Sequence, residues 1–441
     1  MKLLCLSNGH GEDAIAVRIL RQLKSFAGPL ELAALPLVGE GVAYRELGIP
    51  IIGPVKPMPS GGFIYMDGRQ LWRDLRGGLL GLTIAQWQAV RRWVGGSLDG
   101  RFFSRFSLGV VRRPPDWCIE RKGKILAVGD IVPLLFAWWS GGKYAFVGTA
   151  KSEYFLRDEA GVLPGYEWQA WSSSVYLPWE RWLMSSRRCQ AVFPRDSLTA
   201  ARLKPGKIPV FDLGNPMMDD LQPQQPIAAL AHPNGEKGER DRQLTILLLP
   251  GSRSPEAYEN WQLLLQTAAC ILGRRRSKVI FAGAIAPLLT VERMGEMASS
   301  AGWLPRVVRT DYTRSCTASM TYIQKHGTLL LTEKGYNQCL HWADVAIAMA
   351  GTATEQFVGL GKPAIAIPGG GPQFTPAFAE AQSRLLGPSL VLVQQPGQVA
   401  DLLEKLLRDP DWLQLIYENG QRRMGKPGAA RRIATCLTKL P

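Results

Sequence analysis

The chain is poor in the residues that hold disulfide frameworks and metal centres together. Its 441 residues include seven scattered cysteines, which form no Cys-x-x-Cys pair, and only four histidines. The sequence therefore predicts neither a disulfide framework nor a zinc site, and scattered free thiols suit a reducing cytoplasm. No histidine or second acidic cluster supports the pair Asp219-Asp220, so we expect no metal site there either.

The chain also lacks any apolar run of the ~18 residues needed to span a bilayer. Its first residues, Met1–Ser7, lead directly into a glycine loop without a small-residue cleavage site. This pattern indicates a strand and not a signal peptide. A hydrophobic content of 46% predicts a soluble globular protein, and the length predicts two domains.

Positive charge is in excess and is concentrated in one region. The formal net charge is +15, and Arg69–Lys124 holds twelve basic residues against four acidic ones. Aromatic residues alternate with this charge, namely Trp72, Trp87, Trp93, Phe102, Phe103, Phe106 and Trp117. Such a mixture is typical of contact with the headgroup layer of an anionic membrane, which we predict for residues 60–117. A solvated basic face above ordinary core aromatics is the alternative. Nucleic acid is not an expected partner, because no helix-turn-helix, RNP or KH signature occurs.

Short apolar runs alternate with helical stretches, which predicts an α/β protein with two doubly wound, Rossmann-like domains. We expect a first domain over residues 1–220 and a Gln- and Pro-rich linker over 221–243. A second domain should cover 244–400, and 401–441 should hold two basic amphipathic helices that pack back toward the first domain. Ligands of such folds bind at the carboxyl ends of the strands, in a cleft between the domains.

The most informative segment is Asp344–Gly370, which reads as strand, tight turn, short helix and second strand. A helix N-terminus offers free N–H groups and partial positive charge, so this turn is predicted to hold a phosphate. Glu355 or Gln356 would then bind sugar hydroxyls, and Gln373 follows the last strand within reach. The predicted phosphate-binding residues of the turn are Gly351, Thr352, Ala353 and Thr354. The alternative is an ordinary strand–turn–helix unit.

A second glycine turn follows the buried strand Leu244–Leu249. There Gly251, Ser252 and Arg253 are predicted to bind a diphosphate, because an arginine can pair with it through two hydrogen bonds. A structural arginine is the alternative.

The first strand ends in a glycine loop with the pattern Gly-x-Gly-x-x-Ala, which occurs in dinucleotide-binding proteins. Glu12 and Asp13 place negative charge where a pyrophosphate would bind, which disfavours NAD or flavin. His10 in this loop and Asp130 after the strand Lys124–Val128 are the candidate general bases. A loop histidine without chemistry and a turn-forming aspartate are the alternatives. The loop residues predicted to lie near an acceptor are Asn8, Gly9, Gly11 and Glu12.

These pieces together resemble the lipid-A-disaccharide synthase family of glycosyltransferases. The segments that carry the resemblance are Leu247–Arg253, Ala350–Gln356, Leu213–Asp219, Phe193-Pro194 and Pro427–Ala430. It covers most of residues 190–436, and the nearest branch is the synthase-related one of cyanobacteria and plants. Two departures occur. Gln356, not Glu355, stands in register with the conserved acid of the family, and the first loop reads SNGHGED instead of an acidic-serine glycine loop.

The resemblance implies the two-domain GT-B fold and an inverting, metal-independent hexosyltransferase. It would move a sugar from a UDP-sugar, with no other cofactor, to a lipid acceptor at the inner face of a membrane. The second domain would bind the donor and the first the acceptor, with Asp130 or His10 as base. A UDP-sugar epimerase or hydrolase of the same fold, or a non-catalytic nucleotide-sugar-binding protein, is the alternative. Oligomeric state is left open, with a homodimer among the options.

Overall fold

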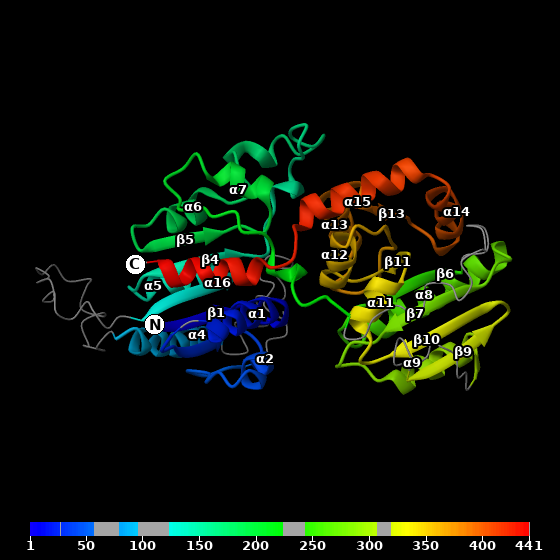
Figure 1. The fold of residues 1–441 in the computed structure, drawn as a ribbon, viewed down its shortest axis with the longest axis horizontal. Helices are drawn as coiled ribbons and strands as arrows, with labels where there is room; N and C mark the ends of the chain where they lie inside the picture. The colour runs from blue at the N-terminus through cyan, green and yellow to red at the C-terminus, as the bar shows by residue number, and fades with distance from the viewer. Residues whose placement is uncertain (27, 57–78, 96–122, 224–242, 307–318, 441) are drawn as a thin grey trace, which may run out of the picture. The chain divides into compact units, whose positions relative to one another are not determined.

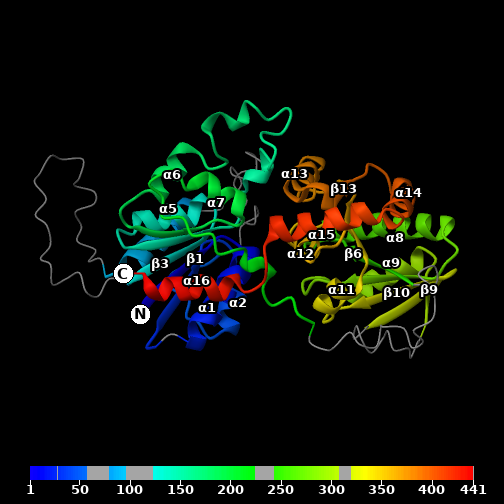
Figure 2. The same ribbon diagram turned by 45° about the horizontal axis from the view of Figure 1, so that its top comes forward.

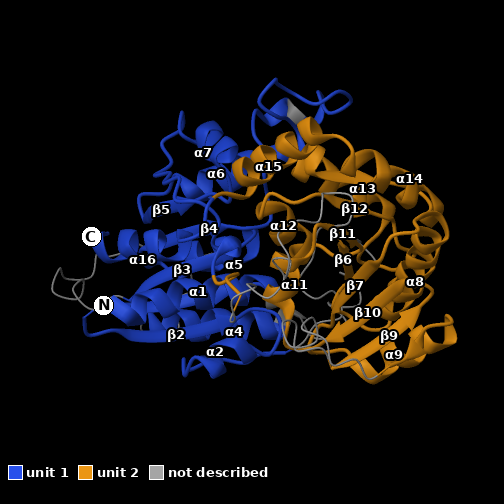
Figure 3. Ribbon diagram, turned by 45° about the vertical axis from the view of Figure 1, so that its right-hand side comes forward, with its two compact units in different colours: residues 1–219, 426–441 blue, residues 220–425 orange. Residues whose placement is uncertain are grey.

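The computed structural model describes residues 1–26, 28–56, 79–95, 123–223, 243–306 and 319–440 (Figure 1). Most of the predicted membrane-contact segment 60–117 lies outside these ranges. The chain forms two compact units, coloured separately in Figure 3. Unit 1 comprises residues 1–219 and 426–441, and unit 2 comprises residues 220–425. Residues 401–441 were expected to pack back toward the first domain, but only residues 426–441 belong to unit 1.

Unit 1 is built on a five-stranded parallel sheet with the order β2-β1-β3-β4-β5. Each strand is a short, almost wholly buried apolar run, as expected for a parallel sheet covered on both faces. The strands are β1 (Lys2–Ser7), β2 (Glu31–Pro36), β3 (Lys124–Gly129), β4 (Tyr144–Gly148) and β5 (Cys189–Phe193).

Alternate strand residues of unit 1, such as Leu4 and Leu6, form one core cluster with Val90 of α4 and Leu134 of α5. The last helix of the chain, α16, packs beside the first helix, α1, as Figures 1 and 2 show. The helices are α1 (His10–Phe26), α2 (Val42–Glu46), α4 (Leu79–Trp93), α5 (Ile131–Trp139), α6 (Pro178–Met184), α7 (Ser197–Leu203) and α16 (Ala429–Lys439).

Unit 2 contains an eight-stranded sheet with the order β13-β12-β11-β6-β7-β10-β9-β8. The first six of these strands are parallel, and β9 and β8 extend one edge by antiparallel pairing. The strands are β6 (Leu244–Leu249), β7 (Val279–Ala284), β8 (Leu304–Pro305), β9 (Met320–Gln324), β10 (Gly327–Thr332), β11 (Val345–Ala348), β12 (Ala364–Ala366) and β13 (Leu390–Leu392).

The helices of unit 2 pack on this sheet around large buried side chains. Trp261 of α8 is fully buried and donates from its indole nitrogen to the Met294 carbonyl. The helices are α8 (Glu256–Arg274), α9 (Val291–Ser300), α11 (Tyr336–Trp342), α12 (Thr352–Gly359), α13 (Pro376–Leu386), α14 (Pro396–Leu407) and α15 (Pro410–Met424). Within the described ranges, no helix is both long enough and apolar enough to cross a bilayer.

The structure corrects several local expectations. The short apolar runs at 51–54 and 210–213 also predict strands, but in the structure they form only single bridges, at Ile51 and Val210. The C-terminal region holds three helices where two were expected, because Pro396 starts α14 and Pro410 starts α15. The first helix begins at His10, so the expected loop is shorter. The antiparallel edge of unit 2 was not predicted at all.

In each sheet the strand order reverses at one point, and this point is where we look for a ligand-binding site. In unit 1 the reversal lies between β1 and β3, which start the two halves of the sheet. In unit 2 it lies between β6 and β11. The loops that follow such neighbouring strands diverge to opposite faces of the sheet, and ligands of doubly wound folds bind where they part.

Candidate functional site

The turn between β11 and α12 in unit 2 presents an open helix N-terminus. Gly351 is the N-cap residue and no side chain caps the helix. Thr352 is exposed, and Gly351 and Ala353 are partly exposed. Such an end suits an anion, because the first-turn N–H groups point outward and the helix dipole is positive there.

Side chains from two helices fix this turn from within. Thr354 is fully buried and its hydroxyl donates to the Ala350 carbonyl at 2.5 Å. Gln382 of α13 donates from Nε2 to the carbonyls of Ala350 and Gly351, at 3.2 and 3.0 Å. Thr354 was predicted to offer its hydroxyl to a ligand. In the structure this hydroxyl donates to the backbone of its own turn and so stabilises the turn.

The second glycine turn follows β6, the neighbour of β11. Gly251 has a φ of +98°, and a Cβ there would lie 3.4 Å from the Met349 carbonyl oxygen. Asn260 of α8 donates to the Pro250 carbonyl at 3.0 Å and holds the turn. Ser252 is exposed and Arg253 partly exposed. The two glycine turns predicted from the sequence are thus adjacent at the reversal point of unit 2.

A third loop, between β12 and α13, lies at the same edge of the unit 2 sheet. It is held by Glu256, a residue that the sequence analysis did not identify. The buried carboxylate of Glu256 accepts from the backbone N–H groups of Gln373 and Phe374, at 3.0 and 2.6 Å. A Cβ at Gly371 would lie 2.4 Å from the Glu256 carboxyl carbon. The side chain of Gln373 is exposed. Acidic residues are common in the first turn of helices, so the sequence alone does not show that Glu256 holds a distant loop.

The structure distinguishes the two candidate ribose-binding residues. Gln356 is buried, and its Oε1 accepts from the Tyr336 hydroxyl at 2.6 Å, which ties α12 to α11. Glu355 lies in the first turn of α12 and is 9% exposed. Gln356 therefore has a packing role that would survive without any ligand.

At the reversal point of unit 1, Asp130 and Asn8 come together from β3 and β1. Asp130 is the N-cap of α5, and its Oδ1 accepts from Val132 N at 2.9 Å and from Asn8 Nδ2 at 3.2 Å. Burial raises the pKa of Asp130, while these hydrogen bonds, from Val132 first and then Asn8, lower it. Asp130 thus links the loop after β3 to the loop after β1. It also lies at the carboxyl end of β3, as the sequence predicted.

Glu12 lies beside this pair in the first turn of α1. A Cβ added at Gly129 would lie 3.3 Å from Glu12 Cγ, so the β3 loop closely approaches this side chain. The Thr149 hydroxyl lies 3.5 Å from Glu12 Oε1. Burial, and to a smaller extent the neighbouring charges of Asp130 and Asp13, raise the pKa of Glu12 to about 7. This carboxyl group can therefore gain or lose a proton near neutral pH.

Asp13 belongs to a polar network inside unit 1. It is 2% exposed and accepts from the Ser7 hydroxyl at 2.5 Å, and Ser7 in turn lies 2.6 Å from the Tyr44 hydroxyl. Burial raises the pKa of Asp13 to about 7. Three carboxyl groups thus gather where a dinucleotide would place its pyrophosphate, which argues against NAD or flavin at this loop.

The remaining residues of the first loop are placed by their backbone. Gly9 has a φ of 129°, a conformation that glycine favours, and it precedes α1. Gly11 is exposed on the first turn of the helix. The backbone of His10 starts α1, and its side chain lies outside the described part of the structure.

The predicted family segments Leu213–Asp219 and Pro427–Ala430 meet within unit 1. The buried Asp219 carboxylate accepts from the backbone N–H groups of Gly428, Ala429 and Ala430 and so caps α16. Arg432 donates from Nε to the Leu213 carbonyl at 2.9 Å. The chain leaves unit 1 after the first segment and returns to it just before the second. The contacts between the two segments therefore hold these two parts of the chain together. Among the residues described, no cluster of three or more His, Cys, Asp or Glu side chains could hold a metal ion.

Comparison with solved structures places this architecture among known folds. MurG from Acinetobacter baumannii matches with a TM-score of 0.52 and 14% identity, over 99% of each chain. The UDP complex of MnaA from S. aureus matches with a TM-score of 0.52 and 12% identity, over 100% of this chain and 99% of that one. UDP-GlcNAc 2-epimerase from Neisseria meningitidis, bound to UDP-GlcNAc, gives 0.50 and 11% over the full length of both chains. The chain has the GT-B fold.

This assignment confirms the predicted fold class of two Rossmann-like α/β domains. The chain matches no family model and no curated protein sequence. The resemblance to lipid-A-disaccharide synthase therefore rests on the sequence segments alone. At these identities the likeness of the GT-B structures concerns the fold.

Proposed function

We propose that this protein is a glycosyltransferase that moves a sugar from a UDP-sugar to a lipid acceptor. The observation that carries the proposal is the uncapped N-terminus of α12 beside the Gly251 turn, at the reversal point of unit 2. This edge offers backbone N–H groups and Arg253 to a diphosphate, with Glu355 as the side chain for the ribose. The neighbours of the same fold that were solved with UDP or UDP-GlcNAc support a UDP-sugar as the ligand.

Unit 1 supplies the proton acceptor in this proposal. The acceptor hydroxyl attacks the anomeric carbon, the bond from that carbon to the diphosphate oxygen breaks, and the hydroxyl proton passes to a carboxylate. Glu12 suits this role better than Asp130, because its pKa is about 7 and Asp130 already accepts two hydrogen bonds. Asp130 and His10, predicted from the sequence, are the competing bases. The departing UDP is stabilised by the α12 N-terminus and Arg253.

The lipid acceptor, the inversion of configuration and the place at the inner face of a membrane come from the sequence. The segments that resemble the lipid-A-disaccharide synthase-related family support them, as does the basic and aromatic composition of residues 60–117. A UDP-sugar epimerase would use the same fold and the same donor-binding edge, and UDP-GlcNAc 2-epimerases are among the solved structures that this chain resembles. It needs no lipid, which is why the basic aromatic segment favours transfer.

The first test is a thermal-shift screen of the full chain with UDP, GDP, ADP, NAD and UDP-sugars. A ligand present at 100 times its dissociation constant should add about 2.7 kcal/mol to the free energy of unfolding. We expect UDP and one UDP-sugar to stabilise the protein. Stabilisation by NAD alone would assign the site to the first loop and overturn the proposal.

A product assay then separates transfer from epimerisation. The chain is incubated with the stabilising UDP-sugar, with and without a membrane lipid extract. A transferase releases UDP only when the lipid is present, and the sugar appears on the lipid. An epimerase converts the UDP-sugar to its epimer without lipid, and a non-catalytic protein binds it without turnover.

A further inference from the structure

The exposed tryptophans of the described residues all lie in one part of unit 1. Their side chains are 46 to 77% exposed, and they are Trp139, Trp168, Trp171, Trp179 and Trp182. A single exposed apolar side chain is ordinary on a protein surface. Five exposed tryptophans within one stretch of chain indicate a surface that contacts something other than water.

These side chains lie on three connected elements. Trp179 and Trp182 are three residues apart on α6 and therefore share a face. Trp182 lies 5.2 Å from Trp138 between ring centroids, which joins α6 to the end of α5, where Trp139 follows. Trp168 and Trp171 are joined by a backbone hydrogen bond at the 3-10 helix η4 (Gln169–Ser172).

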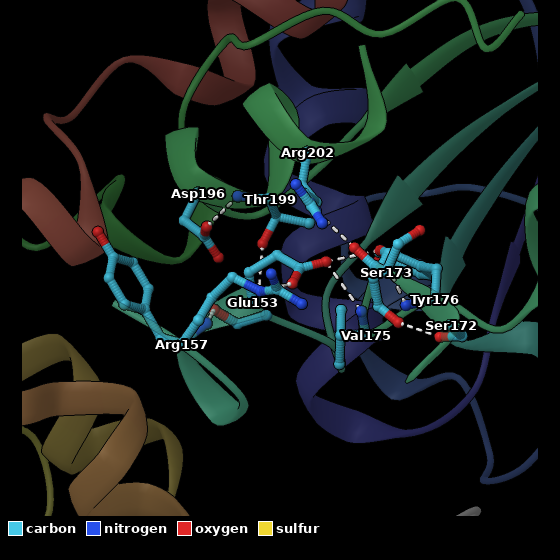
Figure 4. Close-up of polar contacts among 12 residues, drawn as sticks. Glu153, Arg157, Ser172, Ser173, Val175, Tyr176, Asp196, Thr199 and Arg202 are labelled. Atoms are coloured by element: carbon cyan, nitrogen blue, oxygen red, sulfur yellow. Dashed lines mark hydrogen bonds and ion pairs between the residues drawn. The ribbon is translucent and has the colours of Figure 1, made fainter. Parts of the chain in front are cut away.

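The η4 segment is fixed to α6 and α7 by polar contacts, some of which Figure 4 shows. Arg181 donates to the Ser172 carbonyl at 2.8 Å. Arg202 donates to the Ser173 carbonyl at 2.5 Å. The fully buried Glu153 accepts from the Ser174 hydroxyl at 2.6 Å and from Val175 N at 2.8 Å. Trp168 and Trp171, at η4, are therefore presented by a segment that is anchored to α6 through Arg181 and to α7 through Arg202.

Exposed charge on the α5–α6 part of this surface is positive. Helix α5 carries no charged residue, and the only acid of α6, Glu180, is 1% exposed and pairs with Lys151 at 2.6 Å. Arg187 is exposed after α6, and the Arg188 guanidinium lies 5.5 Å from the Trp138 ring centroid. At the η4 end the surface is less positive, because the acids Glu159 and Glu167 are exposed there.

We propose that this tryptophan surface, formed by α5, α6 and η4, docks into the headgroup layer of an anionic phospholipid bilayer. Tryptophan prefers that layer because one end of its ring is apolar and the other donates a hydrogen bond. Arginine beside it attracts lipid phosphate. Tryptophan and arginine are also enriched where proteins contact one another, so a second copy of the chain is the competing occupant that the test must separate from a bilayer.

This inference deepens the membrane location in the proposed function by naming a surface outside residues 60–117, and it can be tested without a nucleotide. Its test uses the full chain and vesicles without UDP-sugar. We expect co-sedimentation with vesicles that contain phosphatidylglycerol, weak binding to phosphatidylcholine alone, and loss of binding between about 0.05 and 0.5 M salt. Trp179→Ala with Trp182→Ala should lower the bound fraction about tenfold. Trp168→Ala with Trp171→Ala should lower it by a smaller factor, and Arg187→Glu should weaken it mainly at low salt.

The matched control removes exposed apolar side chains elsewhere. Leu288 and Leu304 of unit 2 are 73% and 65% exposed, and replacing both by alanine should leave vesicle binding unchanged. Equal binding by the wild type and both tryptophan pairs, or no binding by the wild type at low salt, would overturn the proposal. So would a dimer in solution that Trp179→Ala with Trp182→Ala converts to a monomer, because the surface would then join two copies of the chain.

Discussion

The edges of the two sheets where the strand order reverses carry opposite chemistry. In unit 2 the edge is made of glycine turns around an uncapped helix N-terminus, and its buried acid Glu256 is occupied by backbone N–H groups. In unit 1 the corresponding edge carries the carboxyl groups of Glu12, Asp13 and Asp130. An anion is favoured at the first edge and disfavoured at the second.

In the transfer reaction that we propose, this difference would divide the chemical tasks between the two units. A diphosphate needs fixed N–H groups and positive potential, which the α12 edge provides. A neutral hydroxyl that must lose a proton needs a nearby carboxylate of suitable pKa, which the α1 edge provides. The following predictions test whether each edge has the role that its chemistry indicates.

The largest effect is expected for Glu12→Gln. The variant should lose about 10²–10⁴-fold in kcat, because the amide cannot accept the proton, while UDP affinity stays unchanged. In the wild type the carboxylate is the active form, so with a pKa of about 7 the rate should fall as the pH is lowered below neutrality. Steady-state kinetics over a pH series measure both.

The comparison variants for Glu12 are Asp130→Asn and His10→Asn. If either loses the large factor in kcat while Glu12→Gln keeps its activity, the base is that residue and the assignment of Glu12 is wrong. Melting temperatures must accompany the rates, because Asp130 also caps α5.

The next effect concerns the anion edge of unit 2. Thr352→Glu places a carboxylate at the open N-terminus of α12 and should weaken UDP binding about 100-fold, equivalent to about 2.7 kcal/mol. The fold should tolerate the change, because Thr352 is exposed and an acid near a helix N-terminus is favourable. Calorimetric titration with UDP gives the affinity. Thr352→Ser is the matched control, and unchanged UDP affinity in the glutamate variant would exclude this edge as the phosphate site.

A smaller effect tests whether the two edges belong to separate folding units. Asp219→Ala removes the cap of α16 and should cost about 1–3 kcal/mol of stability in unit 1. For a unit of this size that corresponds to about 2–4 °C in melting temperature per kcal/mol. Calorimetry with and without UDP should show a lowered transition and an unchanged gain from UDP. A lost response to UDP would mean that the two units are not energetically separate.

The sequence predicted the strands and helices around both sites because parallel strands are continuous apolar runs and glycine turns follow them. It also located the turns at Gly251 and Gly351, since both come directly after buried strands. It failed where a role depends on which group a side chain meets in the folded unit. Thr354 bonds to its own turn, and Glu256 holds a loop more than a hundred residues away.

The unit boundary and the acidic edge illustrate the same limit. Asp219 matches a family segment in the sequence, but only the fold shows that its carboxylate caps α16. Glu12 and Asp13 look like exposed acids at the start of a helix, and their raised pKa values arise from burial that only the packed unit creates. Local patterns therefore predicted the elements, and long-range packing determined the chemistry.

The last prediction is a pH dependence of stability in unit 1. Burial raises the pKa of Asp13 from an ordinary 3.8 to about 7, so the folded state holds a proton that the unfolded state releases between these values. This contribution to stability is present below pH 3.8 and is lost as the pH rises to about 7. Asp13→Asn cannot ionise, so its melting temperature should fall less across this range than that of the wild type. Asp212→Asn, at an exposed acid of the same unit, is the control and should keep the wild-type slope. If the melting temperatures of Asp13→Asn and the wild type change with pH in the same way, Asp13 is ionised in the folded protein. Its burial would then not raise its pKa to near neutrality.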